Sequence, residues 1–123
     1  MQLEPNVLQI FKKLQKRDTV TKVKAFNELN AYVEKIEQDS DELPNLLTFF
    51  LYHMCRILIN EPDKHVREAT HETFAAFIRK AKRKLGPHLC KIFPLWYCSF
   101  FDPSPEVAKI ARTNFNIAFP PEK

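Results

Sequence analysis

The sequence predicts an all-α fold. It contains one glycine and nine prolines among 123 residues, and β-hairpin turns need glycine at positive φ more often than this composition allows. Apolar residues recur at steps of three and four, which is the spacing of one face of a helix. Prolines and aspartates separate these segments, as expected where one helix ends and the next begins. The patterns predict a single helical domain over residues 1–123.

The first two helices are expected at residues 1–16 and 20–36. Pro5 suits the first turn of the first helix, and Asp18 or Thr19 is expected to cap the second, because a short polar side chain accepts the free amide hydrogens of a first turn. Both helices should bury one side. Their apolar stripes comprise Val7, Ile10, Phe11 and Leu14 in the first helix and Val23, Phe26, Leu29, Val33 and Ile36 in the second.

The third and fourth helices are expected at residues 44–60 and 63–85. The third is apolar almost all round, which predicts that neighbours cover it on more than one side. Asp63 is expected to cap the fourth helix, and Gly86 followed by Pro87 is expected to end it. Its apolar stripe comprises Val66, Ala69, Thr70, Phe74, Phe77, Ala81 and Leu85.

The last two helices are expected at residues 87–101 and 105–119. Pro94 lies inside the fifth and is expected to kink it, since proline has no amide hydrogen to donate. Ser104 is expected to cap the sixth helix, with Pro105 at its first position. The stripe of the sixth helix comprises Val107, Ile110, Ala111, Phe115 and Ala118.

The second, fourth and sixth helices begin with a shared pattern that suggests an internal repeat. The aligned positions, at offsets of 45 and 41 residues, are Thr21, Ala25 and Leu29, then Val66, Thr70 and Phe74, then Val107, Ala111 and Phe115. A period of about 40–47 residues with two helices per unit is typical of HEAT and armadillo repeats, which stack because one pair cannot bury its own apolar faces. We therefore expect about six helices in three stacked antiparallel pairs, the start of an α-solenoid, although a six-helix bundle could give similar patterns.

Cysteine usage favours a cytosolic or nuclear protein. The chain has a net charge of +4 and three cysteines without a C-x-x-C motif, which we expect to be buried, reduced thiols. No uncharged apolar run reaches the length of about 18 residues that a transmembrane helix needs, and the N-terminus is unlike a signal peptide. A cytosolic monomer with no membrane partner is expected.

Several stretches resemble the N-terminal domain of the listerin family. They are F-K-K-L-Q-K-R-D-T-V-T-K-V-K-A at residues 11–25, V-R-E-A-T at 66–70, K-R-K-L at 82–85, L-W-Y-C at 95–98 and A-F-P-P-E-K at 118–123. The order and spacing match across nearly the whole chain, and only the acidic linker at 38–42 has no recognised counterpart.

The resemblance implies a function in ribosome-associated quality control. Listerins are very long HEAT-type proteins and RING-type E3 ubiquitin ligases that mark stalled nascent chains on the large (60S) ribosomal subunit. Their N-terminal domain is implied to dock on that subunit and to meet a NEMF-like partner, whereas the RING, which engages the E2, lies at the far C-terminal end. The present sequence lacks the Cys/His ligand series of a RING, so the resemblance implies a docking fragment of a longer ligase, without catalytic residues.

Two basic clusters are the candidate binding residues. They hold 11 of the 19 lysines and arginines, and such clusters attract phosphate backbones through counterion release. The alternative is a solvated face that keeps an apolar solenoid soluble. The resemblance favours ribosomal RNA or protein as the ligand of the first cluster. The first comprises Lys12, Lys13, Lys16, Arg17, Lys22 and Lys24, and the second comprises Arg79, Lys80, Lys82, Arg83 and Lys84.

The remaining polar and aromatic groups favour structural roles. Arg67 is expected to hydrogen-bond neighbouring turns, through backbone carbonyls or Asp63. The aromatic residues of the fifth helix are expected in the core rather than in a partner groove. They are Phe93, Trp96, Tyr97, Phe100 and Phe101.

No cofactor, metal or catalytic site is expected. His53 with Cys55 and His88 with Cys90 are close in sequence, but residues two apart on a helix point away from each other, so buried packing is expected instead. No activated nucleophile and no glycine-rich phosphate loop can be recognised. The favoured function is the docking domain of a listerin-type ligase. The alternatives are a HEAT scaffold or transport adaptor without ligase activity, and a basic RNA-binding helical domain acting alone.

Overall fold

The computed structural model describes residues 4–120, and all regular structure within them is helical. The all-α prediction is therefore confirmed. The elements are α1 (Pro5–Leu14), α2 (Thr19–Lys35), α3 (Glu42–Asn60), α4 (Lys64–Ala81), the 3-10 helix η1 (Lys82–His88), α5 (Leu89–Ser99) and α6 (Pro105–Ala118).

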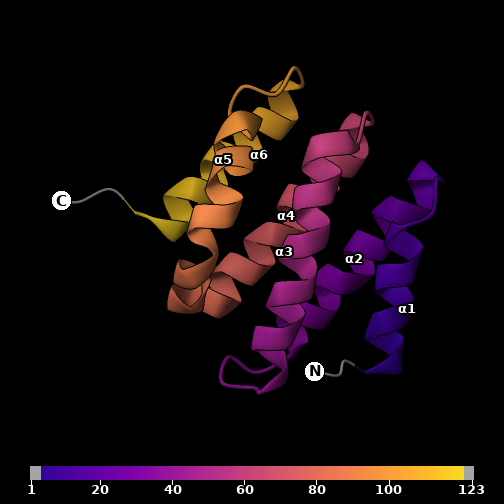
Figure 1. Cartoon of the computed structure of the whole chain (residues 1–123), viewed down its shortest axis with the longest axis vertical. Helices are drawn as coiled ribbons and strands as arrows, with labels where there is room; N and C mark the ends of the chain where they lie inside the picture. The colour runs from indigo at the N-terminus through magenta and orange to yellow at the C-terminus, as the bar shows by residue number, and fades with distance from the viewer. Residues whose placement is uncertain (1–3, 121–123) are drawn as a thin grey trace.

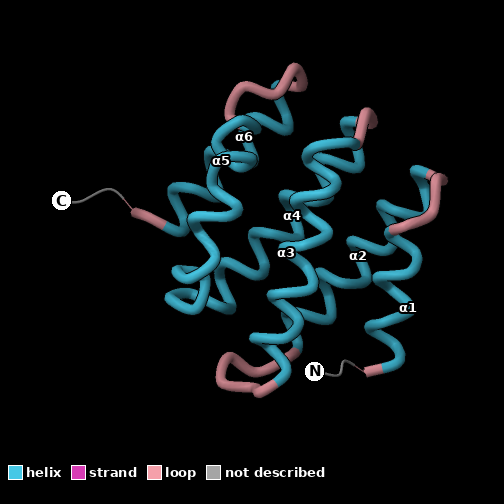
Figure 2. Tube along the Cα trace, viewed as in Figure 1, coloured by secondary structure: helices cyan, strands magenta, loops and turns pink. Residues whose placement is uncertain are grey.

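The helices form two layers. Helices α2, α4 and α6 lie side by side in one layer, with α4 between the other two, and α3 lies beside α5 in the second layer, where α1 also lies (Figure 1). Each second-layer helix packs against its sequence neighbour, α1 on α2, α3 on α4 and α5 on α6. The turns within these pairs lie at one end of the helices, and the α2–α3 loop lies at the other (Figure 2).

Three of the helix starts match their predicted caps. Asp18 accepts a hydrogen bond from the Thr21 amide at 3.0 Å, and Asp63 accepts from the His65 amide at 2.7 Å. The Ser104 hydroxyl accepts from the Val107 amide at 3.5 Å. Short polar side chains at these positions satisfy amides that have no partner within the helix, so the local sequence fixes where α2, α4 and α6 begin.

The predicted end of the fourth helix is wrong. Helix α4 ends at Ala81 rather than Leu85, because Lys82 adopts φ 51° and interrupts the helical hydrogen-bond ladder. Gly86 does not adopt positive φ, and residues up to His88 continue as 3-10 helix, so α5 begins at Leu89. Leu85 is buried as the stripe predicts, and it holds the 3-10 segment against the core.

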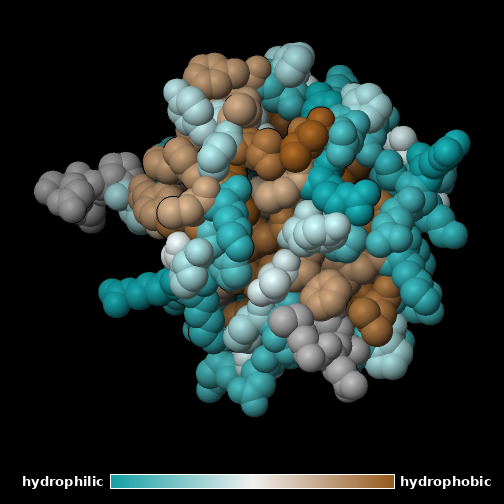
Figure 3. All heavy atoms as spheres, viewed as in Figure 1, coloured by the Kyte–Doolittle hydropathy of each residue, from teal (hydrophilic) through white to brown (hydrophobic). Residues whose placement is uncertain are grey.

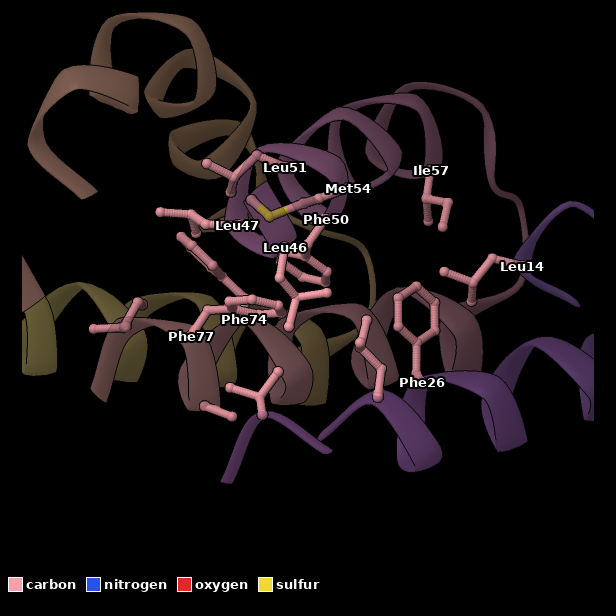
Figure 4. Packing of buried hydrophobic residues seen from close by; sticks show 14 of the residues in the cluster. Leu14, Phe26, Leu46, Leu47, Phe50, Leu51, Met54, Ile57, Phe74 and Phe77 are labelled. Carbon is pink, nitrogen blue, oxygen red and sulfur yellow. The ribbon is translucent and has the colours of Figure 1, made fainter. Parts of the chain in front are cut away.

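One continuous aromatic core joins the pairs. Phe50 of α3 stacks on Phe77 of α4 at a centroid distance of 4.5 Å and meets Phe26 of α2 edge-on at 6.5 Å (Figure 4). Phe74 continues this core to Trp96 of α5, with centroids 4.8 Å apart. Helix α3 therefore contacts several neighbours, as its all-round apolar character predicts.

Other burial predictions hold only in part. Trp96 is fully buried, whereas Tyr97 of α5 and Phe101 in the turn after α5 are exposed, and apolar side chains gather at the surface in this region (Figure 3). Cys90 and Cys98 are exposed and only Cys55 is half-buried, so the prediction of buried thiols is wrong for two of the three. Within residues 4–120, no helix has both the length and the apolar character needed to cross a membrane.

Candidate binding surfaces

Two cations are used to join successive helix pairs. Lys22 of α2 contacts Glu61 at 2.6 Å, with side-chain exposures of 16% and 7%. Arg67 of α4 contacts both carboxylate oxygens of Asp102, at 2.8 and 3.0 Å, and also donates to the carbonyls of Glu61 and Pro62. The predicted structural role of Arg67 is confirmed, with Asp102 as the carboxylate partner in place of Asp63.

The contacts at the two junctions are related by the offsets of the expected repeat. Lys22 and Arg67 are related by the offset of 45 residues, and Glu61 and Asp102 by the offset of 41. A second contact repeats in the same way. The Thr73 hydroxyl donates to the Phe26 carbonyl at 3.1 Å, and at the next junction the Asn114 amide donates to the His71 carbonyl at 2.8 Å. The repeat alignment contained the signal for these bonds, but helix periodicity alone did not reveal it.

The second junction also buries a titratable ring. His71 is fully buried, and neither ring nitrogen has a hydrogen-bond partner among the described residues. Burial lowers the pKa of His71 to about 4, against a smaller opposing effect of Asp102. Burial raises the pKa of Asp102, but hydrogen bonds from Arg67 and the Ser104 amide outweigh it, so this pKa lies below its usual value. At neutral pH the junction holds a neutral imidazole beside an ion pair.

The first basic cluster leaves four exposed cations around the α1–α2 turn, which we name the turn surface: Lys12, Lys16, Arg17 and Lys24. No acidic side chain among the described residues pairs with them. The nearby acids have other partners, since Glu28 pairs with Lys13 at 3.2 Å and Asp18 caps α2. Hydrogen bonds from Thr21, and more weakly the charge of Lys24, lower the pKa of Asp18.

The second cluster divides between packing and an open surface. Lys80 donates to the Glu34 carbonyl at 3.1 Å, and Lys84 donates to the Gln38 carbonyl at 3.0 Å. Carbonyls at a helix end lack partners within the helix and attract cations. Lys80 therefore holds the end of α2 against α4, and Lys84 holds the following loop against the 3-10 segment. The other three cations make no hydrogen bond or ion pair with the described residues: Arg79, Lys82 and Arg83.

These three cations border an apolar pocket of about 580 Å³, which we name the α4-end pocket. Its walls come from the last turn of α4, the 3-10 segment, the first residue of α5 and the end of α6. None of the described residues that line it is acidic, and a Cβ atom added at Gly86 would meet no atom within 4 Å. The lining residues are Ile78, Arg79, Lys82, Arg83, Leu85, Gly86, Leu89, Ile117, Ala118 and Phe119.

The α1–α2 turn and the end of α4 lie at opposite ends of the helices (Figure 1). Helix α4 begins beside the α1–α2 turn, where Asp63 accepts a hydrogen bond from Thr19, and it ends at the pocket. Its 18 residues span about 27 Å. The structure therefore separates the two clusters, and one small ligand cannot bridge them.

The histidine–cysteine pairs of the sequence do not converge. His53 is buried against the Phe11 ring at 5.1 Å, and burial, followed by the charge of Arg56, lowers its pKa. Cys90 is exposed, which contradicts the buried packing expected for the second pair. Within residues 4–120, no group of three or more His, Cys, Asp or Glu side chains is arranged to hold a metal ion.

Comparison with known proteins matches residues 3–123 to the family described as "E3 ubiquitin-protein ligase listerin, N-terminal domain". The E3 ubiquitin-protein ligase listerin of Mus musculus is 33% identical over 114 residues, which are 93% of this chain and 6% of the relative. That of Drosophila melanogaster is 32% identical over 117 residues, 95% of this chain and 6% of the relative. That of Schizosaccharomyces pombe is 28% identical over 121 residues, 98% of this chain and 7% of the relative. No solved structure matches.

Proposed function

This chain belongs to the family of listerin N-terminal domains, and from that premise we propose that it is a docking domain that binds a listerin-type E3 ubiquitin ligase to the large (60S) ribosomal subunit. The relatives named E3 ubiquitin-protein ligase are far longer, since the chain covers only 6% of the mouse protein. Transfer of ubiquitin from an E2 therefore belongs, on this proposal, to a RING domain outside these residues. The stacked helices supply a rigid platform for docking.

The proposed architecture is the beginning of a HEAT-type α-solenoid. Its main support is the repetition of two inter-pair bonds, Lys22 with Glu61 and Arg67 with Asp102, at the offsets found in the sequence. The bonds from Thr73 and Asn114 follow the same offsets. Stacking repeats make contacts mainly with their neighbours, so equivalent bonds at successive junctions are expected of a solenoid but not of an irregular bundle.

The observation that carries the proposed function is the turn surface. Four exposed cations gather around one turn while the acids beside them are occupied by caps and ion pairs. Ribosomal RNA presents a dense array of phosphates, and binding to it releases counterions. We assign the contact to the turn surface rather than to the second cluster, because the free cations of the second cluster border an apolar pocket. Lys22 is assigned to packing, since Glu61 already holds it.

The setting of the proposed function is the cytosol, in ribosome-associated quality control. The domain would act as a monomer within the ligase, near a NEMF-like factor on the same subunit, so that stalled nascent chains are ubiquitinated. Family membership supports this setting.

Co-sedimentation with purified large ribosomal subunits across a salt series tests the proposal. We expect Lys16→Glu/Arg17→Glu/Lys24→Glu to weaken binding by at least about tenfold and to reduce the salt slope by about 2, because roughly three phosphate contacts are lost.

The matched control reverses the same number of charges elsewhere, at the exposed residues Lys35, Lys91 and Lys109. Binding by this control should stay within about twofold of the unmodified chain. Circular dichroism should show that both variants remain helical. Equal binding by the unmodified chain and the turn-surface variant would contradict the proposal.

A further inference from the structure

We propose that the α4-end pocket binds an acidic segment of a partner protein that presents two leucine-like side chains one helical turn apart. This inference concerns a surface other than the one assigned to the ribosome, and it does not depend on ribosome docking. The proposal rests on one observation, that the same pocket has apolar walls and a rim whose charged residues are all cationic.

The walls leave apolar surface that the described residues do not cover. Ile117 and Phe119 at the end of α6 remain 38% and 42% exposed although both line the pocket. Leu85 of the 3-10 segment, in contrast, is buried and forms part of the floor. A volume of about 580 Å³ lies within the range of pockets that hold drug-sized ligands. It therefore has room for more than one large side chain, as an amphipathic helix in a groove requires.

The rim selects the charge of the occupant. Arg79, Lys82 and Arg83 line the pocket, and no described lining residue is acidic. Lys80 and Lys84, their sequence neighbours, already donate to carbonyls of Glu34 and Gln38. The three remaining cations thus have unused hydrogen-bonding capacity at the edge of an apolar surface. Carboxylates beside the leucine anchors would form charge-assisted hydrogen bonds with them.

The walls favour a peptide over single-stranded RNA. Nucleic-acid sites of this kind use several aromatic faces on which successive bases stack. Here the walls are mainly aliphatic, from Ile78, Leu85, Leu89 and Ile117, with Phe119 the one aromatic among the lining residues. Aliphatic walls accept leucine side chains and give a base little to stack on.

Fluorescence anisotropy with a defined peptide tests the inference. The probe is a labelled peptide of about 12 residues, mostly Glu, Asp and Ala, with two leucines four positions apart. We expect a dissociation constant on the order of 10–100 μM. Arg79→Glu/Lys82→Glu/Arg83→Glu should weaken binding by at least about tenfold, and the same peptide with both leucines changed to serine should bind at least about tenfold more weakly.

Two further variants keep the result interpretable. Ile117→Ser changes an exposed position, so it should leave the fold intact while weakening peptide binding by about threefold or more. The control is the turn-surface variant Lys16→Glu/Arg17→Glu/Lys24→Glu, which has the same change in charge far from the pocket and should bind the peptide within about threefold of the unmodified chain. Because the readout contains no ribosome, failure here is distinct from failure of the docking proposal.

Four results would overturn the inference. The first is no binding of the leucine peptide to the unmodified chain at about 1 mM. The second is equal binding of the serine peptide, and the third is equal weakening by the pocket variant and the control variant, either of which would indicate attraction by net charge alone. The fourth is displacement of the peptide by oligouridine at equal concentration, which would assign the pocket to nucleic acid.

Discussion

At the junction between the first and second helix pairs, Lys22 meets Glu61 through one contact of 2.6 Å. At the next junction, the equivalent Arg67 binds both oxygens of Asp102 and two backbone carbonyls. The two cations are 45 residues apart and the two acids 41 residues apart, and the residue type determines how many bonds form at each junction. An arginine fork can make four bonds where a lysine ammonium makes one here, so the two junctions should differ in strength.

The junctions also differ at one helix position, the residue whose backbone carbonyl accepts the hydrogen bond between the two helix pairs. Phe26 occupies it at the first junction and His71 at the second, where Thr73 and Asn114 respectively donate to the carbonyl. Both side chains are fully buried. Only the second junction therefore has a titratable ring at this position, and this ring should make the junction respond to mild acid.

Breaking the second junction should give the largest effect. Arg67→Ala removes four bonds and leaves Asp102, whose side chain is 9% exposed, without its cation. We expect a loss of about 4 kcal/mol in the free energy of unfolding, measured by urea denaturation. The single tryptophan, Trp96, is buried against Phe74 of the neighbouring pair, so its fluorescence reports on this junction.

Arg67→Lys is the matched control, because it keeps the charge and loses the fork. It should recover less than half of the lost stability. A loss below about 1 kcal/mol for Arg67→Ala, which is typical of an exposed ion pair, would show that the junction does not depend on this side chain.

Acid should weaken the second junction through His71. Its folded-state pKa of about 4 lies below the ordinary value of 6.5, so the unfolded chain binds the proton first. Stability is then fully present above pH 6.5 and falls as the pH decreases towards 4, by on the order of 3 kcal/mol. Urea denaturation at a series of pH values measures this loss.

His71→Phe places the side chain of the first junction in the second. This variant should lose less stability than the unmodified chain between pH 6.5 and pH 4, and the difference between the two curves isolates His71 from His53, whose pKa burial also lowers. Parallel curves would contradict a buried neutral imidazole. Asp102 titrates lower, because its pKa lies below the usual 3.8.

Breaking the first junction should cost less than breaking the second. Lys22→Ala removes one charged contact and leaves Glu61 7% exposed, for an expected loss of about 2 kcal/mol. Lys24→Ala is the control from the same basic cluster and should change stability by less than about 0.5 kcal/mol, since Lys24 is exposed. Equal losses of unfolding free energy for the two variants would contradict the assignment of Lys22 to packing and of Lys24 to the surface.

Local sequence predicted most of the fold. The caps at Asp18, Asp63 and Ser104 depend on bonds within three residues, and each was correct. The end of α4 was predicted too late because Gly86 and Pro87 are strong helix-ending signals. A lysine such as Lys82 rarely adopts positive φ, so the sequence did not indicate that the helix ends there.

Sequence could not divide the basic clusters into packing and surface residues. The partners of Lys22, Lys80 and Lys84 lie 39 to 46 residues away, beyond any local pattern. The α4-end pocket was missed for the same reason, since its walls come from α4, the 3-10 segment, α5 and α6. The repeat alignment did contain the pairing of Arg67 with Asp102, because Lys22 and Glu61 precede them at the same offsets.

Together, the two proposals give this domain two separate cationic surfaces with different ligands. The most direct measurement sets the turn-surface and pocket variants side by side, in co-sedimentation with large ribosomal subunits and in anisotropy with the leucine peptide. We predict that the turn-surface variant loses at least about tenfold in affinity for the subunit, and that the pocket variant loses as much in affinity for the peptide. Each variant should keep its affinity for the other ligand within about threefold. If both variants lose affinity for both ligands equally, the two basic clusters act as a single binding surface, which would contradict this assignment.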